Sequence, residues 1–302
     1  MRVGAIDLGT NSTRLLVADV VDGRVEEVVR RLTITRLGEG VDTTHRLDPA
    51  AIARVWDCLD DYRTELTTRG AERVLATATS AVRDSENGTE FLADLARRYG
   101  VMTRLLTGDE EAGLTFRGVS SDRTLAAETL IVDIGGGSTE LLLGGPDGVA
   151  FATSLQVGCV RLTERFLRSD PPCEDELAGC AAHVRDVLPP LAPTAALGVA
   201  GTITTLAAID LDLPAYDPEQ IHGHRISRET VERELRRLAR MPLGERRQVR
   251  GLEPARAPVI VAGIAILNEI VDAYDLSEIE ASERDILHGV ALAAAEPAKG
   301  DT

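Results

Sequence analysis

Two segments of the sequence each place an acidic residue, small residues and hydroxyl groups at the end of an apolar strand. Residues 6–17 read IDLGTNSTRLLV and residues 132–143 read VDIGGGSTELLL, and they align without a gap. Gly-rich bends let backbone N–H groups approach phosphate oxygens, and the Ser-Thr hydroxyls add donors. Asp7 and Asp133 can hold Mg²⁺ through water, because this ion prefers oxygen ligands and dehydrates reluctantly. The duplication favours two phosphate-facing hairpins over two ordinary glycine turns.

Further side chains could take part in phosphate chemistry. Glu110 and Glu111 are adjacent at the start of a helix expected over Gly108–Val119. Acidic residues in a first helical turn also occur simply because they favour the helix dipole. The functional alternative is that one of the pair takes the proton from a water molecule. Arg83, in ATSAVRDSENG, is either a surface residue or a ligand for phosphate, which Arg can bind through two hydrogen bonds.

Other motifs are less specific. The stretches GCVRLTE at 158–164 and GVAGTITTLAA at 198–208 are glycine-marked turns from strand to helix. We expect His222 and His224 to lie in a strand or loop, because a third ligand at a recognised spacing is not evident. The sequence contains no Walker A motif, GxSxG elbow or Cys–His pairing that would indicate another nucleophile.

The elements around these motifs repeat. Each half opens with an apparent antiparallel meander and continues with alternating helices and strands. Polar, unpatterned residues near 120–127 mark the boundary, so we expect domains over 1–122 and 123–285, with the C-terminal segment 286–302 able to join the first. The strands are expected over 3–7, 13–21, 24–36, 73–77 and 101–106, and over 130–133, 139–143, 149–157, 195–199 and 278–281. The helices are expected from 49, over 90–98 and 108–119, and over 160–167, 174–187, 228–240, 259–274 and 286–295.

Composition limits the class of protein. The 302 residues carry a formal net charge of −16, which argues against a protein that coats nucleic acid. A local group of Arg side chains and N–H groups can still bind a small polyanion. The sequence has no apolar run long enough for a membrane span and no signal-peptide core, so a cytoplasmic protein is expected. The four Cys residues are expected to be reduced thiols.

Two strand-rich halves of the same order describe an α/β protein with two actin-like ATPase (ribonuclease H-like) domains and a cleft between them. This inference is an analogy at the level of fold. The motifs in their order also resemble the exopolyphosphatase / guanosine pentaphosphate phosphohydrolase (Ppx/GppA) family over essentially the whole chain, in its short single-unit form. The element GDEEA at 108–112 is the most discriminating part of this resemblance.

The resemblance implies hydrolysis of a terminal phosphoanhydride in inorganic polyphosphate or guanosine pentaphosphate (pppGpp). Glu111 is implied as the general base, and Glu140 as the carboxylate that positions the attacking water. Asp7 and Asp133 are implied as the acids on the metal side, with Mg²⁺ expected and Mn²⁺ as an alternative. Arg83 is implied as the phosphate-binding Arg, and a homodimer is expected from the family alone. The phosphate loops are implied to consist of Thr10, Asn11 and Ser12, and of Gly135, Gly136, Gly137, Ser138 and Thr139.

The sequence departs from the family pattern at three places. Gly113 stands where an Arg is common, and Pro258 where an Asp is usual, which puts activity level and substrate choice in question. SERDILHGV at 282–290 replaces a more frequent Leu-Arg-Glu-Gly ending. Two other functions stay open: an alarmone-binding or nucleotide-binding regulatory protein that is inactive or weakly active, and a kinase or ATPase of the same superfold. Intact Glu111 and Glu140 favour the hydrolase.

Overall fold

A computed structural model describes residues 1–296 of the chain. The contacts between residues divide the chain into two compact units. Among the described residues, unit 1 contains residues 1–123 and 284–296, and unit 2 contains Thr124–Glu283. Of the predicted C-terminal segment 286–302, residues 297–302 lie outside the described part.

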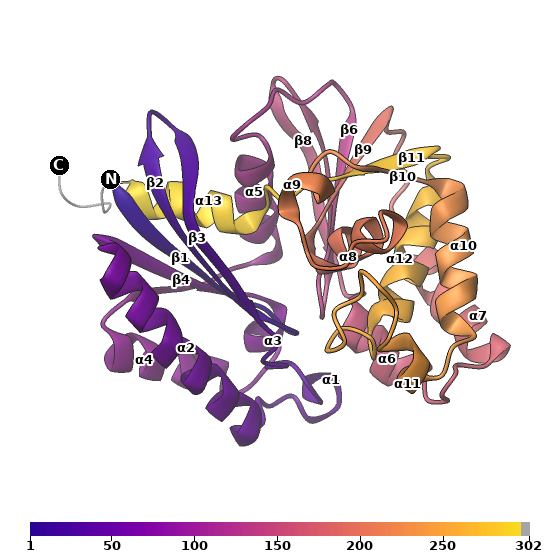
Figure 1. Ribbon diagram of the computed structural model, residues 1–302, viewed down its shortest axis with the longest axis horizontal. Helices are drawn as coiled ribbons and strands as arrows, with labels where there is room; N and C mark the ends of the chain where they lie inside the picture. Colours follow the sequence, from indigo (N-terminus) through magenta and orange to yellow (C-terminus); the bar gives the residue numbers. More distant parts are fainter. Residues whose placement is uncertain (297–302) are drawn as a thin grey trace. The chain divides into compact units, whose positions relative to one another are not determined.

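Unit 1 is built on a five-stranded mixed sheet in the order β3-β2-β1-β4-β5 (Figure 1). The first three strands form an antiparallel meander, whereas β4 and β5 run parallel to β1. The strands are β1 (Arg2–Leu8), β2 (Thr13–Val21), β3 (Arg24–Thr33), β4 (Arg73–Ala78) and β5 (Met102–Leu105).

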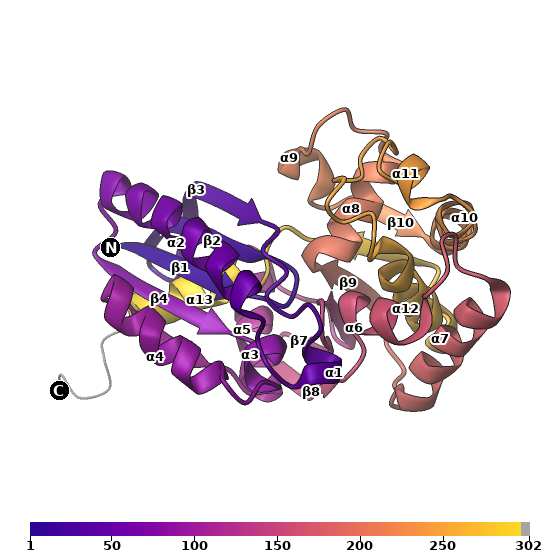
Figure 2. The same ribbon diagram turned by 90° about the horizontal axis from the view of Figure 1, so that it is seen from below.

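Helices cover both faces of this sheet, because successive side chains of a strand point to opposite sides. Ile6 and Leu8 of β1 pack against α2 (Pro49–Arg69) and α4 (Gly88–Tyr99). Val3 and Ala5 pack on the other face, against α5 (Gly108–Val119) and the C-terminal α13 (Ile286–Ala295). Figure 2 shows α2 and α4 in front of the sheet and α13 behind it. Two short helices, α1 (Val41–Thr44) and α3 (Ser80–Arg83), complete the unit.

The sheet of unit 2 repeats the same order and adds an edge strand. Its order is β8-β7-β6-β9-β11-β10, in which β8, β7 and β6 are antiparallel neighbours and β9 and β11 are parallel additions. The strands are β6 (Thr129–Ile134), β7 (Thr139–Gly145), β8 (Gly148–Leu155), β9 (Ala195–Val199), β10 (Arg225–Ser227) and β11 (Glu278–Ala281). The prediction of two α/β units with duplicated topology is therefore confirmed.

Leu130, Val132 and Ile134 of β6 point into the main core of unit 2, which the helices of this unit close. Figure 1 shows these helices in orange and rose beside the sheet. They are α6 (Cys159–Phe166), α7 (Glu174–Val187), α8 (Ala200–Asp210), α9 (Pro218–Ile221), α10 (Arg228–Ala239), α11 (Leu243–Arg246) and α12 (Ile260–Ala273).

All four cysteines are free, and no helix of the described residues is both long and apolar enough to cross a bilayer.

The structure corrects one predicted element and adds several short ones. The third strand was expected to reach Arg36 but ends at Thr33. Arg36 has a φ of 50° and donates its backbone N–H to the carbonyl of Asn11 at 2.9 Å, so the chain leaves the ladder there. The short strand β10 (Arg225–Ser227) and the short helices α1, α3, α9 and α11 were not predicted from the sequence.

Candidate active site

The two aligned segments form the same turn. In each hairpin a four-residue loop joins the strands, Gly9–Ser12 between β1 and β2 and Gly135–Ser138 between β6 and β7. In each loop the glycine N–H donates to the carbonyl of the serine three residues later, at 3.0 Å in both copies. A Cβ atom would lie 3.0 Å from that oxygen at Gly9 and 3.1 Å at Gly135, which explains the glycine. The duplicated sequence therefore folds into duplicated loops.

Neighbouring segments hold the first loop by its carbonyl groups. The carbonyl of Thr10 accepts from Gly38 N–H at 2.8 Å, and that of Asn11 accepts from Arg36 N–H at 2.9 Å. The buried hydroxyls of Thr10 and Ser80 share a hydrogen bond of 2.9 Å. A side chain at Gly38 would overlap Thr10, so the bracing segment must pass close beneath the loop.

The start of α6 holds the second loop in the same way. Cys159 N–H donates to the carbonyl of Gly135 at 3.0 Å, and Val160 N–H donates to that of Gly136 at 2.9 Å. Arg161 Nε donates to the carbonyl of Gly137 at 2.7 Å. Thus the GCVR sequence, which alone was a weak motif, supplies the support for the GGG loop.

This bracing orients the amide groups of both loops. In a planar trans peptide the C=O and the following N–H point in opposite directions. The carbonyl groups of Thr10 and Asn11 accept hydrogen bonds from the bracing segment. The N–H groups that follow them, of Asn11 and Ser12, therefore point away from that segment. The equivalent N–H groups in unit 2 belong to Gly136, Gly137 and Ser138. Successive N–H groups oriented in this way form a concavity suited to anionic oxygens.

Asp7 is paired with a cation inside unit 1. It faces Arg14 in the antiparallel ladder, and its Oδ2 accepts from Arg14 Nε at 3.0 Å and from Nη2 at 2.6 Å. The side chain is buried, and within residues 1–296 its Oδ1 has no hydrogen-bond partner. Burial raises the pKa of Asp7, which Arg14 offsets only in part. The same part of the chain contains one other such buried atom, Nδ2 of Asn11 in the adjacent loop.

Asp133 has a carboxylate at the equivalent ladder position in unit 2. Asp133 faces Glu140, and both side chains are buried. Residues directly opposite in such a ladder have Cβ atoms roughly 5 Å apart on the same face of the sheet. Ser154 of β8 donates its hydroxyl to Glu140 Oε1 at 2.6 Å, and Thr139 donates its hydroxyl to the carbonyl of Val157 at 2.6 Å. Unit 2 thus presents two acids where unit 1 presents an ion pair.

The two glutamates at the start of α5 have different roles. Glu110 is the partly exposed N3 residue of a capping box: it accepts from the backbone of Thr107, whose hydroxyl accepts from Glu110 N–H. Glu111 is buried, and its Oε2 accepts from Arg83 Nη1 at 3.2 Å. Arg83 Nη1 also donates to the carbonyl of Leu106 at 2.8 Å. The structure therefore joins Glu111 and Arg83, two predicted site residues that are separated in the sequence.

A divalent cation fits only a site that is completed by water and substrate oxygens. The buried Oδ1 of Asp7 is an unsatisfied oxygen of the kind that Mg²⁺ prefers. No group of three His, Cys, Asp or Glu side chains that could hold a metal is present among residues 1–296. This donor set agrees with Mg²⁺, which is usually bound by one or two carboxylates together with water and phosphate. It does not agree with a site of protein ligands alone.

Comparison with known proteins gives the family. The sequence pattern of the Ppx/GppA phosphatase family matches residues 16–296. The chain belongs to this family. Exopolyphosphatase 2 of Mycobacterium tuberculosis is 41% identical over 97% of this chain and 98% of its own length. The crystal structure of the Aquifex aeolicus Ppx/GppA family member has a TM-score of 0.81 at 32% identity, with 97% of each chain covered. A Cytophaga hutchinsonii exopolyphosphatase has a TM-score of 0.88 at 28% identity, with 96% of each chain covered.

Membership of the Ppx/GppA family confirms the prediction of a phosphoanhydride hydrolase. The departures from the family pattern can be placed in the structure. Gly113 lies in α5, where an added Cβ would meet open space. Among the described residues, no neighbouring group therefore fills the position at which the family commonly has an Arg side chain. Pro258 precedes α12, whose first residue is Ile260. His222 Nδ1 accepts from the backbone N–H of Glu283 at 3.1 Å, and His224 Nε2 bonds Asp210 at 2.9 Å, as suits loop residues.

Sequence reasoning missed the residues that hold the site in place. Ser80 and Gly38 support the first loop, Arg161 supports the second, and Ser154 bonds Glu140. Arg161 and Ser80 had a signal, since they belong to the quoted motifs GCVRLTE and ATSAVRDSENG. Gly38 and Ser154 lie outside the quoted motifs and reach the loops only through the folded sheet.

Proposed function

We propose that this member of the Ppx/GppA family hydrolyses the terminal phosphoanhydride of inorganic polyphosphate. The observation that carries the proposal is the pairing of the buried Glu111 with the partly exposed Arg83, with Glu111 Oε2 and Arg83 Nη1 at 3.2 Å. Two loops of N–H donors suit any phosphate ligand, whereas hydrolysis also needs a base and a cation that stabilises charge on the transferred group. The names of the Mycobacterium and Cytophaga relatives support polyphosphate as the substrate.

In the proposed reaction a water oxygen attacks the terminal phosphorus as the bond from phosphorus to the bridging oxygen breaks. Glu111 takes the proton of the water, and Glu140 orients the water. Arg83 binds the oxygens of the transferred phosphoryl group, where a guanidinium stabilises developing charge. The bridging oxygen leaves as the new terminal oxygen of the chain. The products are inorganic phosphate and a polyphosphate that is one unit shorter.

The loops supply the remaining phosphate contacts in this proposal. Donors from Thr10, Asn11 and Ser12 hold one part of the substrate, and the N–H groups of Gly136, Gly137 and Ser138 hold another. The N–H of Gly135 and the hydroxyl of Thr139 support the loop instead, because they donate to carbonyl groups of the protein. Asp7 and Asp133 would hold Mg²⁺, or Mn²⁺, through water. The ion would neutralise charge on the phosphate oxygens and so favour attack by the water.

Phosphate release from polyphosphates of several defined lengths and from pppGpp tests the proposal. Each substrate is assayed with Mg²⁺, with Mn²⁺ and with a chelator. We expect release of one phosphate at a time from polyphosphate in the presence of metal, with slower release from pppGpp. A protein that binds these ligands but releases no phosphate would contradict the proposal and favour an alarmone-binding regulator. Stabilisation against heat by ATP and a sugar, and not by polyphosphate, would instead indicate a kinase.

A further inference from the structure

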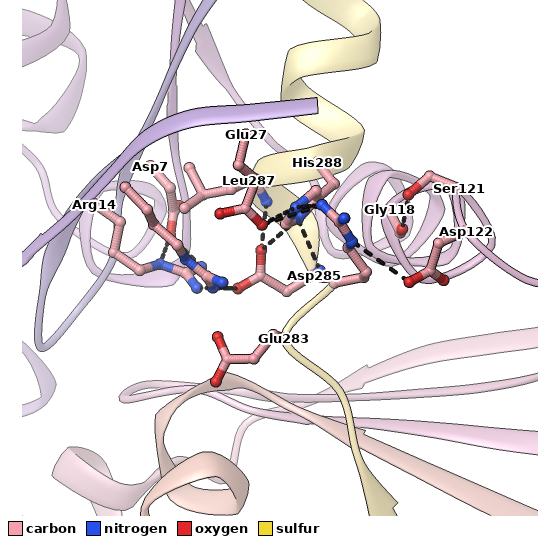
Figure 3. Close-up of polar contacts among 12 residues, drawn as sticks. Asp7, Arg14, Glu27, Gly118, Ser121, Asp122, Glu283, Asp285, Leu287 and His288 are labelled. Atoms are coloured by element: carbon pink, nitrogen blue, oxygen red, sulfur yellow. Dashed lines mark hydrogen bonds and ion pairs between the residues drawn. The ribbon is translucent and has the colours of Figure 1, made fainter. Parts of the chain in front are cut away.

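The side chain of Arg14 lies between two buried carboxylates of unit 1. Figure 3 shows it reaching Asp7 on one side and Asp285 on the other. Its Nε and Nη2 donate to Asp7 Oδ2, at 3.0 and 2.6 Å, and its Nη1 donates to Asp285 Oδ2 at 2.5 Å. Arg14 thus links the first phosphate hairpin to the residue that precedes α13, within the SERDILHGV segment that departs from the family pattern.

Asp285 is fixed on every side. Its Oδ1 caps α13 by accepting from Leu287 N–H at 2.9 Å, and its Oδ2 also accepts from Arg30 Nη2 at 3.2 Å. Its own backbone N–H donates to His288 Nδ1 at 3.3 Å, and His288 Nε2 bonds Glu27 of β3 at 2.9 Å. The Asp285 side chain is only 2% exposed. The carboxylate is therefore a rigid anchor for the guanidinium of Arg14.

This anchor determines how Arg14 binds Asp7. An unconstrained guanidinium commonly binds a carboxylate in a bidentate way, with one hydrogen bond to each oxygen. Arg2 and Asp19, on the same two strands, show that arrangement: Arg2 Nε donates to Oδ1 at 3.0 Å and Nη2 to Oδ2 at 2.7 Å. In Arg14, by contrast, Nε and Nη2 both donate to Oδ2 of Asp7, and Nη1 donates to Asp285. As a result Oδ1 of Asp7 stays buried, with no hydrogen-bond partner among residues 1–296.

We propose that Asp285 is a positioning residue for Asp7: by holding Arg14, it keeps Oδ1 of Asp7 directed to a divalent cation or to a water of its coordination shell. This inference rests on the metal-side role of Asp7 in the proposed function. Without the carboxylate of Asp285, Arg14 can move to bind both oxygens of Asp7, as Arg2 binds Asp19. The oxygen offered to the cation would then be lost to the ion pair.

The test is Mn²⁺ binding to the substrate-free protein, measured by the loss of the free-ion paramagnetic resonance signal at 0.15 M salt. Asp285→Asn removes the charge but keeps a good N-cap, since Asn and Ser cap helices as well as Asp does. Asp285→Ser is the second variant if the first unfolds, and thermal unfolding verifies both. Asp19→Asn is the matched control, because it removes the same charge from the other Asp–Arg pair. That pair lies five ladder positions away, roughly 16 Å, beyond the Debye length.

We expect the dissociation constant for Mn²⁺ to rise about tenfold in Asp285→Asn, as is typical when a partner of a metal ligand is removed. It should change less than about twofold in Asp19→Asn. Equal affinities in these two variants, with binding lost in Asp7→Asn, would overturn the positioning role and leave the metal role of Asp7 intact. Wild-type affinity in Asp7→Asn would overturn both, while the phosphate-release assay would still test hydrolysis separately.

Discussion

Asp7 and Arg14 face each other across the first hairpin and form a buried ion pair, whereas the equivalent residues of the second hairpin, Asp133 and Glu140, are both acids. The two hairpins share their ladder positions, their loop length and their loop hydrogen bond, so the charge at this one position distinguishes them. A cation in the first hairpin neutralises the neighbouring Asp. An acid in the second adds a carboxylate next to the loop that we propose binds phosphate.

The first prediction concerns that added acid. In Glu140→Gln, an amide oxygen can still accept from Ser154, but the negative charge that we propose orients the attacking water is lost. We expect kcat for phosphate release to fall by about a hundredfold, the cost of a poorly placed nucleophile. Ser154→Ala, which removes only the partner of Glu140 Oε1, is the control and should have a smaller effect. A kcat in Glu140→Gln close to wild type would rule out this role.

A second prediction concerns the planar fork of Arg83. Arg83→Lys keeps the charge, but a Lys side chain cannot hold Glu111, the Leu106 carbonyl and the proposed phosphate ligand in one fixed geometry. We expect kcat/KM for polyphosphate to drop by at least tenfold, which steady-state kinetics measures. Arg104→Lys alters the exposed partner of Glu110 and serves as the control. If both variants lose activity equally, the loss does not depend on the specific geometry of Arg83.

The two glycines of α5 should respond oppositely to alanine. An added Cβ at Gly113 meets open space, and Ala stabilises a helix interior by up to about 1 kcal/mol relative to Gly. At Gly118 the Cβ would overlap the carbonyl of Asp285, and forcing extra atoms into such a contact costs about 1–3 kcal/mol. Urea denaturation should therefore give a higher free energy of unfolding for Gly113→Ala and a lower one for Gly118→Ala. Equal changes would contradict the close approach of α5 and the residue before α13.

The pH dependence of stability should report on Asp285. Burial alone would raise the pKa of this carboxyl, but Arg14 and Arg30 hold it well below its usual range. A carboxyl with a lowered pKa in the folded state stabilises the protein above its unfolded pKa of about 4 and loses this contribution as the pH falls further. The difference in free energy of unfolding between wild type and Asp285→Asn should thus be largest near pH 6 and shrink below pH 4. Denaturant titrations at several pH values measure it; a constant difference would argue against the ion pair.

Much of the fold followed from local patterns in the sequence. The helix over Gly108–Val119 and the strand over Ala195–Val199 have the predicted bounds, because their apolar spacing and their flanking residues are local signals. The duplicated hairpins predicted the repeated sheet order. The extension of the third strand to Arg36 was wrong, since the bond from Arg36 to Asn11 that ends this strand is a tertiary contact.

The supports of the site could not be predicted in the same way. Arg14 and Asp285 are 271 positions apart in the sequence, and only the packing of α13 on the first sheet brings them together. Ser80 lies 70 positions from Thr10, which it braces. The choice between Glu110 and Glu111 also required the structure: both satisfy the same sequence pattern, and the capping box of Thr107 engages the first and leaves the second buried beside Arg83.

The central claim is that Glu111 takes the proton of the attacking water, and single-turnover release of phosphate from polyphosphate in Glu111→Gln tests it most directly. Glu110→Gln is the matched control, because Gln preserves a capping box. We predict that the Glu111 variant binds polyphosphate with affinity within a few-fold of wild type but releases phosphate about 10²–10⁴ times more slowly, the usual contribution of a general base. The control should release phosphate at close to the wild-type rate. Release by Glu111→Gln within a few-fold of wild type would contradict the mechanism.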